Sequence, residues 1–119
     1  MSKFSKYICD SNYTISEVYK HIKKKKTTFA IITKKKSVIG IFTLGDYKDS
    51  LFKGINLKNK IITIAKKNFF KLEQGYDKSI LKKSFRKNTI DFIPVLKKSN
   101  LVDIIFKDQI FKFYKKTIK

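Results

Sequence analysis

Three residues around the end of a predicted strand could together form part of a nucleotide site. Gly40, Thr43 and Asp46 occupy a strand-to-helix junction. The strand is predicted at residues 38–42, and the helix after it is predicted to end at Gly54. A glycine lets a ligand approach the backbone, a threonine hydroxyl can bond a phosphate or sugar oxygen, and the first turn of a helix offers free N–H groups to an anion. The carboxylate of Asp46 is placed one turn further in, where it could accept two hydrogen bonds from a ribose diol.

The same three residues also have a purely structural explanation. Thr43 can cap the helix, Asp46 can complement the helix dipole, and Gly40 can be a spacer in a crowded strand. On the local sequence alone the structural explanation is favoured, because single capping residues are common. The choice therefore depends on the rest of the chain.

The composition offers little chemistry for an enzyme. The chain has 119 residues, the size of one domain that can bury a core without disulfides. Cys9 is the only cysteine, which excludes an intrachain disulfide and a thiolate metal cage, and we expect it to be a buried small hydrophobe. His21 is the only histidine, and there is no Ser–His–Asp constellation and no H-E-x-x-H motif. We therefore expect a protein that is not an enzyme, with no catalytic and no metal-binding residues.

The chain is strongly basic, with a formal net charge of +20. Such a charge suggests a nucleic acid or an anionic membrane as partner. However, Arg86 is the only arginine among the 29 basic residues, whereas surfaces that clamp phosphates or read bases usually use the bidentate fork of arginine. The lysines are also scattered over predicted helix ends and turns. We interpret most of the charge as solvated surface, so that nucleic acid is not an expected partner.

No apolar run of the sequence approaches the length of a membrane span, and residues 1–10 lack the long apolar stretch of a signal peptide. We therefore expect a cytoplasmic protein without a membrane span.

The positions of the apolar residues predict alternating strands and helices in the first half of the chain. After a polar lead at residues 1–6 and a brief strand at residues 7–9, the sequence T-I-S-E from Thr14 fits the capping box of a helix. A strand buried on both faces is predicted at Phe29–Ile32, and a turn at residues 34–37 leads to the strand at residues 38–42. The apolar residues of the first helix are Ile15, Val18, Tyr19 and Ile22, and those of the second are Leu44, Tyr47 and Leu51.

The second half repeats this plan at a constant offset, with Phe29 corresponding to Phe92 (92 − 29 = 63). At the same offset, Asp77 corresponds to Thr14 as an N-cap, and a turn at residues 97–100 corresponds to that at 34–37. The second copy thus has a helical stripe of Leu81 and Phe85, strands at Phe92–Leu96 and Leu101–Phe106, and a helix from Asp108 to about Lys115. Because neither copy alone buries its apolar faces, we expect both to pack as one domain of residues 1–119, an α+β fold like an α/β sandwich.

A tandem repeat of this length and order resembles the CBS domain pair, also called the Bateman module. The signature residues are G-I-F-T-L-G-D at Gly40–Asp46 and I-P-V at Ile93–Val95. The resemblance covers about residues 6–110 and implies two repeats, at about residues 7–57 and 60–116, related by a pseudo-twofold axis. The family is regulatory and typically binds adenosine-containing ligands in clefts between its repeats. The resemblance therefore implies a non-enzymatic module that needs no cofactor and binds AMP, ADP or ATP as a regulatory ligand.

A second likeness concerns residues 43–57, T-L-G-D-Y-K-D-S-L-F-K-G-I-N-L. They are similar to the CBS pair that precedes the catalytic domain in certain bacterial sugar nucleotidyltransferases. The four glycines of this chain include no G-x-G, so the phosphate loop of such a transferase is not present in these residues. The likeness implies a nucleotidyltransferase catalytic domain as a partner, whether the chain is an excised regulatory part or a stand-alone module.

The resemblance also implies which residues bind the ligand. The ribose and phosphate contacts fall on Thr43 and Asp46, with Gly40 giving room. Three further residues are expected to edge or line the pocket, Thr14 and Tyr13 at its rim and Ile31 beside the base.

The second repeat departs from the pattern of the family. It has Asp103 opposite Gly40, Phe106 opposite Thr43 and Gln109 opposite Asp46. Phenylalanine has no hydroxyl, and a neutral amide is a poorer acceptor for two ribose hydroxyls than a carboxylate. We therefore expect at most one nucleotide site of the usual kind.

The family also commonly forms dimers through its helices, which implies a homodimer. The candidate contact residues are Leu51, Phe52, Phe85 and Phe111, which could equally be core residues. Two alternatives to a nucleotide sensor remain open. The first is a dimerisation or scaffold domain without a ligand, and the second is a binder of RNA or an acidic membrane through residues 111–116.

Overall fold

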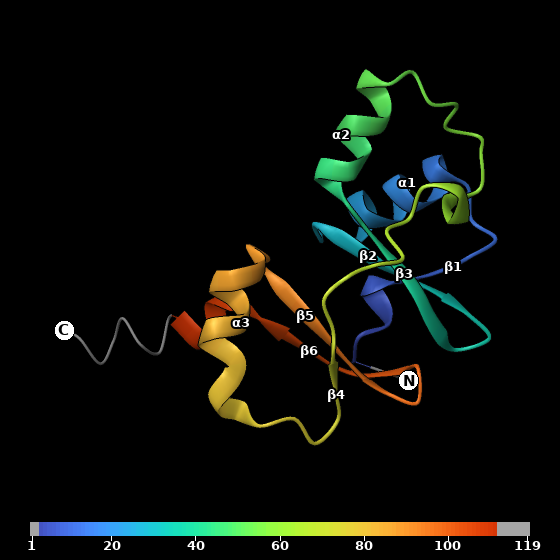
Figure 1. The fold of residues 1–119 in the computed structure, drawn as a ribbon. Coiled ribbons are helices and arrows are strands. Elements are labelled where there is room, and N and C mark those ends of the chain that lie inside the picture. Colours follow the sequence, from blue (N-terminus) through green and yellow to red (C-terminus); the bar gives the residue numbers. More distant parts are fainter. Residues whose placement is uncertain (1–2, 112–119) are drawn as a thin grey trace. The chain divides into compact units, whose positions relative to one another are not determined.

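The computed structural model describes residues 3–111, which fall into two compact units (Figure 1). Unit 1 is Met1–Phe69 and unit 2 is Phe70–Lys119. Each unit has a three-stranded sheet and helices, as expected for an α+β fold.

In unit 1, the sheet has a long central strand that is hidden from solvent. β1 (Ile8–Asp10) pairs in parallel with β2 (Phe29–Lys34), and β2 pairs in antiparallel fashion with β3 (Ser37–Thr43). The first four residues of β2, F-A-I-I, are all buried, which confirms the prediction of a strand covered on both faces. β3 instead alternates between buried and half-buried residues, with Val38, Gly40 and Phe42 on the buried face.

Two helices pack on the face of this sheet that carries Ile32 and Phe42, α1 (Ile15–Lys25) and α2 (Leu44–Phe52). α1 begins with the predicted capping box: the Glu17 N–H donates to Thr14 Oγ1 at 3.1 Å, and the Thr14 N–H donates to Glu17 Oε1 at 2.8 Å. The predicted stripe of α1 is confirmed, since Ile15, Val18 and Ile22 are fully buried. Half-buried Tyr19 stacks on Tyr47 of α2 with ring centroids 3.9 Å apart.

The N-terminal lead differs from the prediction. Residues Ser5–Tyr7 form a short 3-10 helix, η1, and β1 begins at Ile8 rather than at residue 7. Two aromatic side chains hold this segment: Phe4 is buried, and the ring of Tyr7 stacks on Phe29 with centroids 4.8 Å apart. The segment is therefore anchored to the fold, although most of its residues are polar.

Unit 2 repeats the strand plan of unit 1. β4 (Leu72–Glu73) is parallel to β5 (Phe92–Lys97), and β5 is antiparallel to β6 (Asn100–Phe106). The duplication extends to detail, because a register irregularity after Ile32 in β2 recurs after Val95 in β5, at the predicted offset. Both hairpins also close through two residues with positive φ, Lys35–Lys36 and Lys98–Ser99, a geometry that suits the twist of an antiparallel pair.

The helices of unit 2 follow the prediction with small differences. Asp77 accepts the N–H of Ser79 at 2.9 Å, but the turn it caps is a 3-10 helix, η3 (Lys78–Ile80), and α3 (Leu81–Asn88) follows. Leu81 and Phe85 are buried, as the stripe predicts. Residues 107–111 are helical, so the last helix begins one residue earlier than predicted. Its predicted end near Lys115 and most of the basic aromatic stretch at 111–116 lie outside the described residues.

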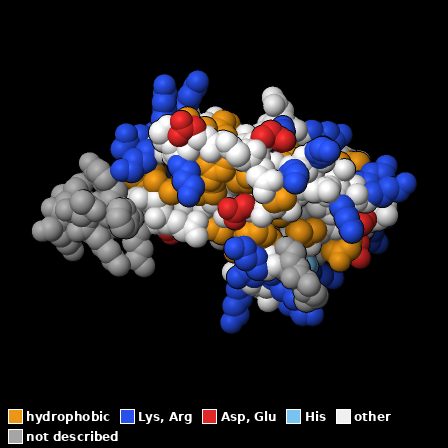
Figure 2. Space-filling view, turned by 90° about the horizontal axis from the view of Figure 1, so that it is seen from below, with side chains coloured by type: hydrophobic (Ala, Val, Ile, Leu, Met, Phe, Trp, Pro, Cys, Tyr) orange, Lys and Arg blue, Asp and Glu red, His pale blue; other side chains and the backbone are white. Residues whose placement is uncertain are grey.

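On the face of the molecule that Figure 2 shows, lysine side chains of the described residues are separated by apolar and acidic side chains. Within residues 3–111, each helix is too short or too polar to cross a bilayer.

Candidate functional site

The junction between β3 and α2 is held by a reciprocal pair of hydrogen bonds. The Asp46 N–H donates to Thr43 Oγ1 at 3.1 Å, and the Thr43 N–H donates to Asp46 Oδ2 at 2.9 Å. Thr43 is thus the N-cap of α2, and Asp46 lies at the positive end of the helix dipole. The structural role of both residues is confirmed, and it fixes the carboxylate of Asp46 in one orientation.

The second oxygen of this carboxylate faces a lysine from later in the chain. Lys66 Nζ lies 3.2 Å from Asp46 Oδ1. The side chain of Asp46 is only 13% exposed, whereas that of Lys66 is 62% exposed. A carboxylate has about four positions for hydrogen-bond donors, so Asp46 can accept further bonds beyond the two observed contacts.

The segment that carries Lys66 crosses unit 1 from the start of α1 to the edge of β3. Ile61, in the 3-10 helix η2 (Ile61–Thr63), is fully buried, and its N–H donates to Tyr13 O at 2.8 Å. Five residues later, Lys66 pairs with Ile41 of β3: the Ile41 N–H donates to Lys66 O at 3.0 Å, and the Lys66 N–H donates to Ile41 O at 2.9 Å. Two separate backbone contacts therefore fix residues 61–66 on unit 1.

Gly40 makes the second of these contacts possible. A methyl group added at Gly40 would lie 3.0 Å from Lys66 O and 3.2 Å from the side chain of Ala65. The glycine gives room, as expected, but the group that comes close to it within unit 1 is the backbone of residues 65–66.

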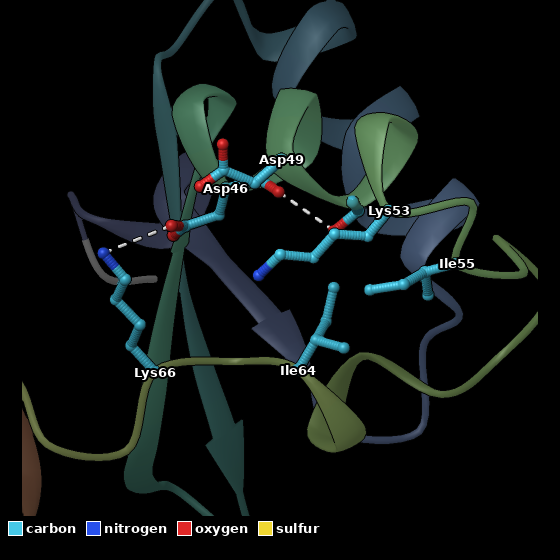
Figure 3. A pocket seen from close by; sticks show the side chains of 7 residues that line it. Asp46, Asp49, Lys53, Ile55, Ile64 and Lys66 are labelled. Atoms are coloured by element: carbon cyan, nitrogen blue, oxygen red, sulfur yellow. Dashed lines mark hydrogen bonds and ion pairs between the residues drawn. The ribbon is translucent and has the colours of Figure 1, made fainter.

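A cleft opens beside this junction, between α2 and residues 55–66 (Figure 3). Its volume is about 310 Å³, at the lower end of the range for small-molecule sites. One wall is polar and comes from α2 and the residue that follows it, and the other is mainly apolar. The lining residues are Asp46, Asp49, Ser50, Lys53, Ile55, Ile64 and Lys66.

Of the residues predicted for the site, Thr43 and Asp46 lie together, and Asp46 lines the cleft. Thr14 and Tyr13 lie elsewhere. Asp10, at the end of β1, pairs with Thr33 near the β2–β3 hairpin, whereas Thr43 pairs with Phe29 at the start of β2. The chain leaving β1 toward α1 and the chain leaving β3 toward α2 therefore emerge at opposite ends of the three-stranded sheet.

Ile31, predicted to lie beside the base, is in the middle of β2 and is fully buried. It pairs with Ile8 and Ile41 on the neighbouring strands and does not line the cleft. The apolar wall is instead made by Ile55 and Ile64, both half-buried.

Sequence reasoning missed most of the cleft. Asp49 and Lys53 follow Asp46 by three and seven residues, so the spacing of one helix face could have identified them. No local pattern marks Ile64 or Lys66, because they reach the cleft through contacts with a distant part of the chain.

In unit 2 the equivalent junction keeps only half of the cap. The Phe106 N–H donates to Gln109 Oε1 at 3.0 Å. This bond is the counterpart of the one that the Thr43 N–H donates to Asp46 Oδ2 in unit 1. Phenylalanine has no hydroxyl to return a bond to the Gln109 N–H. Asp103, opposite Gly40, directs its carboxylate to the neighbouring Ile104 N–H at 2.8 Å.

The thiol of Cys9 and the imidazole of His21 lie outside the cleft and contact other parts of the fold. Cys9 is buried, and burial raises the pKa of its thiol to about 12. His21 is half-buried, and its Nε2 lies 2.9 Å from the carbonyl oxygen of Lys6. Within the described part of the chain, no three His, Cys, Asp or Glu side chains are grouped so as to hold a metal ion.

No family model matches the sequence, and no curated protein matches it either. Solved structures do match. The CBS domain pair of protein MJ0100, in complex with 5′-methylthioadenosine and S-adenosyl-L-methionine, has a TM-score of 0.78 at 20% identity, over 92% of this chain and 88% of that one. A CBS-domain-containing protein from Agrobacterium tumefaciens has a TM-score of 0.75 at 20% identity, over 90% and 87% of the two chains. OpuCA from Staphylococcus aureus has a TM-score of 0.77 at 10% identity, over 92% of both chains. The chain therefore has the fold of a CBS domain pair.

Proposed function

We propose that this chain is a non-enzymatic regulatory module of the CBS-pair family, which binds an adenosine-containing nucleotide in the cleft of unit 1. The observation that carries the proposal is the carboxylate of Asp46, fixed by the Thr43 N–H at 2.9 Å and turned toward the cleft. A similar fold has been solved with two adenosine-containing ligands bound, which supports this class of ligand.

The lining of the cleft suits the parts of a nucleoside. Ile55 and Ile64 offer apolar surface to a base, and Asp46 offers carboxylate oxygens to ribose hydroxyls. Because Asp46 is already held by the cap of α2, binding would not have to order its side chain, and the entropic cost of binding is correspondingly lower.

Regulation in this proposal is a change in the population of conformations. A ligand favours the state to which it binds more tightly, and its effect on an attached or partner protein cannot exceed its differential affinity for the two states. The sequence likeness of residues 43–57 makes a sugar nucleotidyltransferase catalytic domain the partner that we propose.

The test is a calorimetric titration of the full chain with AMP, ADP, ATP and GTP. Asp46→Asn keeps an oxygen for the Thr43 N–H but removes the charge, and we expect it to weaken adenine nucleotide binding about tenfold or more. Glu17→Gln makes the same change in the capping box of α1, away from the cleft, and should bind like the wild type. Failure of all four nucleotides to bind, or equal binding by both variants, would refute the proposal.

One observation favours a second function, that of a homodimerisation scaffold. On α2, Phe52 is 91% exposed and Leu51 is 51% exposed, and together with Lys48 they line a shallow hollow of about 300 Å³. Of the other two residues predicted for this contact, Phe85 is buried and Phe111 packs against it edge-on, with ring centroids 6.5 Å apart. Both belong to the core of unit 2, so the proposed contact is limited to Leu51 and Phe52.

A further inference from the structure

We infer that Lys53 and Lys66 bind the phosphate of the nucleotide in the cleft, and that Lys66 thereby releases Asp46 to the ribose. This inference rests on the proposed function and names the residues that select its ligand. It makes Lys66 a residue that selects a nucleotide over a neutral nucleoside.

The two lysines reach the cleft from opposite walls. Lys53 follows the last residue of α2, and Lys66 belongs to the segment that pairs with β3. Figure 3 shows the ammonium group of Lys53 directed into the space between these walls. Among the described residues, this ammonium group has no hydrogen-bond or ion-pair partner, so it is available to an anion.

The ammonium group of Lys66 forms an ion pair with Asp46, which it can give up for a ligand phosphate. Its ion pair with Asp46 is 3.2 Å long, and its side chain is largely exposed, a setting in which ion pairs are weak. A phosphate group carries more charge than one carboxylate and has more acceptor oxygens, so it competes well for the ammonium group. When Lys66 moves to the phosphate, Asp46 Oδ1 becomes free to accept a hydrogen bond from the sugar.

The backbone allows this exchange without disturbing the fold. Lys66 is held by its main chain, through the two hydrogen bonds with Ile41, and its side chain is not part of the core. A substitution of the Lys66 side chain should therefore change the charge of the cleft and leave unit 1 folded.

Asp49 opposes the phosphate. Its exposed side chain lines the same cleft, so its negative charge repels an anion that Lys53 and Lys66 attract. Removal of this charge by Asp49→Asn should strengthen phosphate binding a few-fold, opposite in sign to the effect of removing either lysine.

The experiment is calorimetry of the full chain with adenosine, AMP and pyrophosphate at fixed ionic strength, on the wild type, Lys53→Met, Lys66→Met and Lys67→Met. Lys67 is the matched control, because it is an exposed lysine next to Lys66 that does not line the cleft. We expect the wild type to bind AMP at least tenfold more tightly than adenosine. We expect Lys53→Met to weaken AMP binding and Lys67→Met to change little.

Lys66→Met gives the sharpest result. It should weaken AMP binding about tenfold while adenosine binding stays equal or becomes tighter, because Asp46 loses its competing cation. Equal affinity of the wild type for adenosine and AMP, or equal effects of Lys66→Met and Lys67→Met, would overturn this inference and leave the proposed function intact. Pyrophosphate binding as tight as AMP binding would also overturn it, since the sugar would then contribute nothing. If adenosine and AMP both fail to bind, and ADP and ATP fail in the calorimetric test above, the proposed function falls as well.

Discussion

A single methyl group at Gly40 should separate the last segment of unit 1 from the edge of β3. Gly40→Ala places its new carbon 3.0 Å from Lys66 O and 3.2 Å from the side chain of Ala65. The first of these neighbours is a backbone oxygen that already accepts the Ile41 N–H, so it cannot move without weakening that bond.

The size of the effect follows from the contacts at risk. The two backbone hydrogen bonds between Ile41 and Lys66 contribute about 1 kcal/mol each, and their loss is partly offset by about 0.5–1 kcal/mol because alanine restricts the unfolded chain. We therefore expect Gly40→Ala to lower the free energy of unfolding by about 1–1.5 kcal/mol. With a urea slope of about 1 kcal/mol per molar, the midpoint should fall by about 1–1.5 M.

Gly45→Ala is the matched control for this change. A methyl group at Gly45, in the first turn of α2, meets only Thr43 Oγ1 at 3.6 Å, an ordinary contact. Because alanine is a better helix former than glycine, this variant should gain roughly 0.5 kcal/mol. The same substitution should thus have opposite signs at two positions five residues apart.

The assay is urea unfolding followed by near-ultraviolet circular dichroism, which reports the stacked rings of Tyr19 and Tyr47 in unit 1. Amide hydrogen exchange at Ile41 and Lys66 supplies a local measure, and we expect it to become faster in Gly40→Ala. An equal or higher midpoint for Gly40→Ala, with unchanged exchange at these two amides, would refute the reasoning.

Four further predictions concern other parts of the chain. Burial raises the pKa of the Cys9 thiol to about 12, so iodoacetamide at pH 8.5 should label Cys9 in urea but not in the folded chain. The free energy of unfolding should also fall as the pH rises above about 9, because only the thiol of the unfolded chain ionises there. Fast labelling of the folded chain would contradict this. The hydrogen bond from the Thr14 backbone, and after it that with the Thr14 side chain, lowers the pKa of Glu17. The capping box therefore stabilises the fold above the ordinary pKa of glutamate and loses this effect as the pH falls through the lowered pKa. The urea midpoints of the wild type and Glu17→Gln should then converge in acid, and a constant difference would count against this. Ile22→Ala removes a fully buried side chain and should lower the free energy of unfolding by about 2–4 kcal/mol in urea titrations, whereas a loss below about 1 kcal/mol would show that the core of unit 1 is looser than described. Phe52→Ser should weaken self-association in sedimentation velocity runs with little change in unfolding, and an unchanged sedimentation profile would argue against the proposed dimer contact.

The strands and helices could be predicted from the sequence because their signals are local and occur twice. The apolar run of β2 and the capping box at Thr14 each identify an element from neighbouring residues. The constant offset then transfers each assignment to the second half, and even the register irregularity after Ile32 has its counterpart after Val95.

The cleft was less predictable, because its second wall depends on tertiary contacts. Ile64 and Lys66 lie in a stretch with little periodicity, and only the pairing of Lys66 with Ile41 brings them to α2. β1 and β3 run in opposite directions, so the two helices start at opposite ends of the sheet, and Thr14 does not line this cleft. Strand direction, rather than residue type, decides which candidates can meet.

The contacts of residues 61–66 also bear on how the chain folds during synthesis. Ile61 and Ala65 belong to the core of unit 1, and Lys66 pairs with β3, yet all three are made after both helices of that unit are complete. A nascent chain that ends at residue 57 has the strands and helices of unit 1 but lacks Ile61 beside α1 and the pairing partner of Ile41. Because domains generally fold from the N-terminus as they are synthesised, unit 1 can reach its final packing only after residues 61–66 have left the ribosome, when synthesis of unit 2 is already under way. Until then unit 1 has an apolar gap in its core and an unpaired strand edge, a state that favours aggregation.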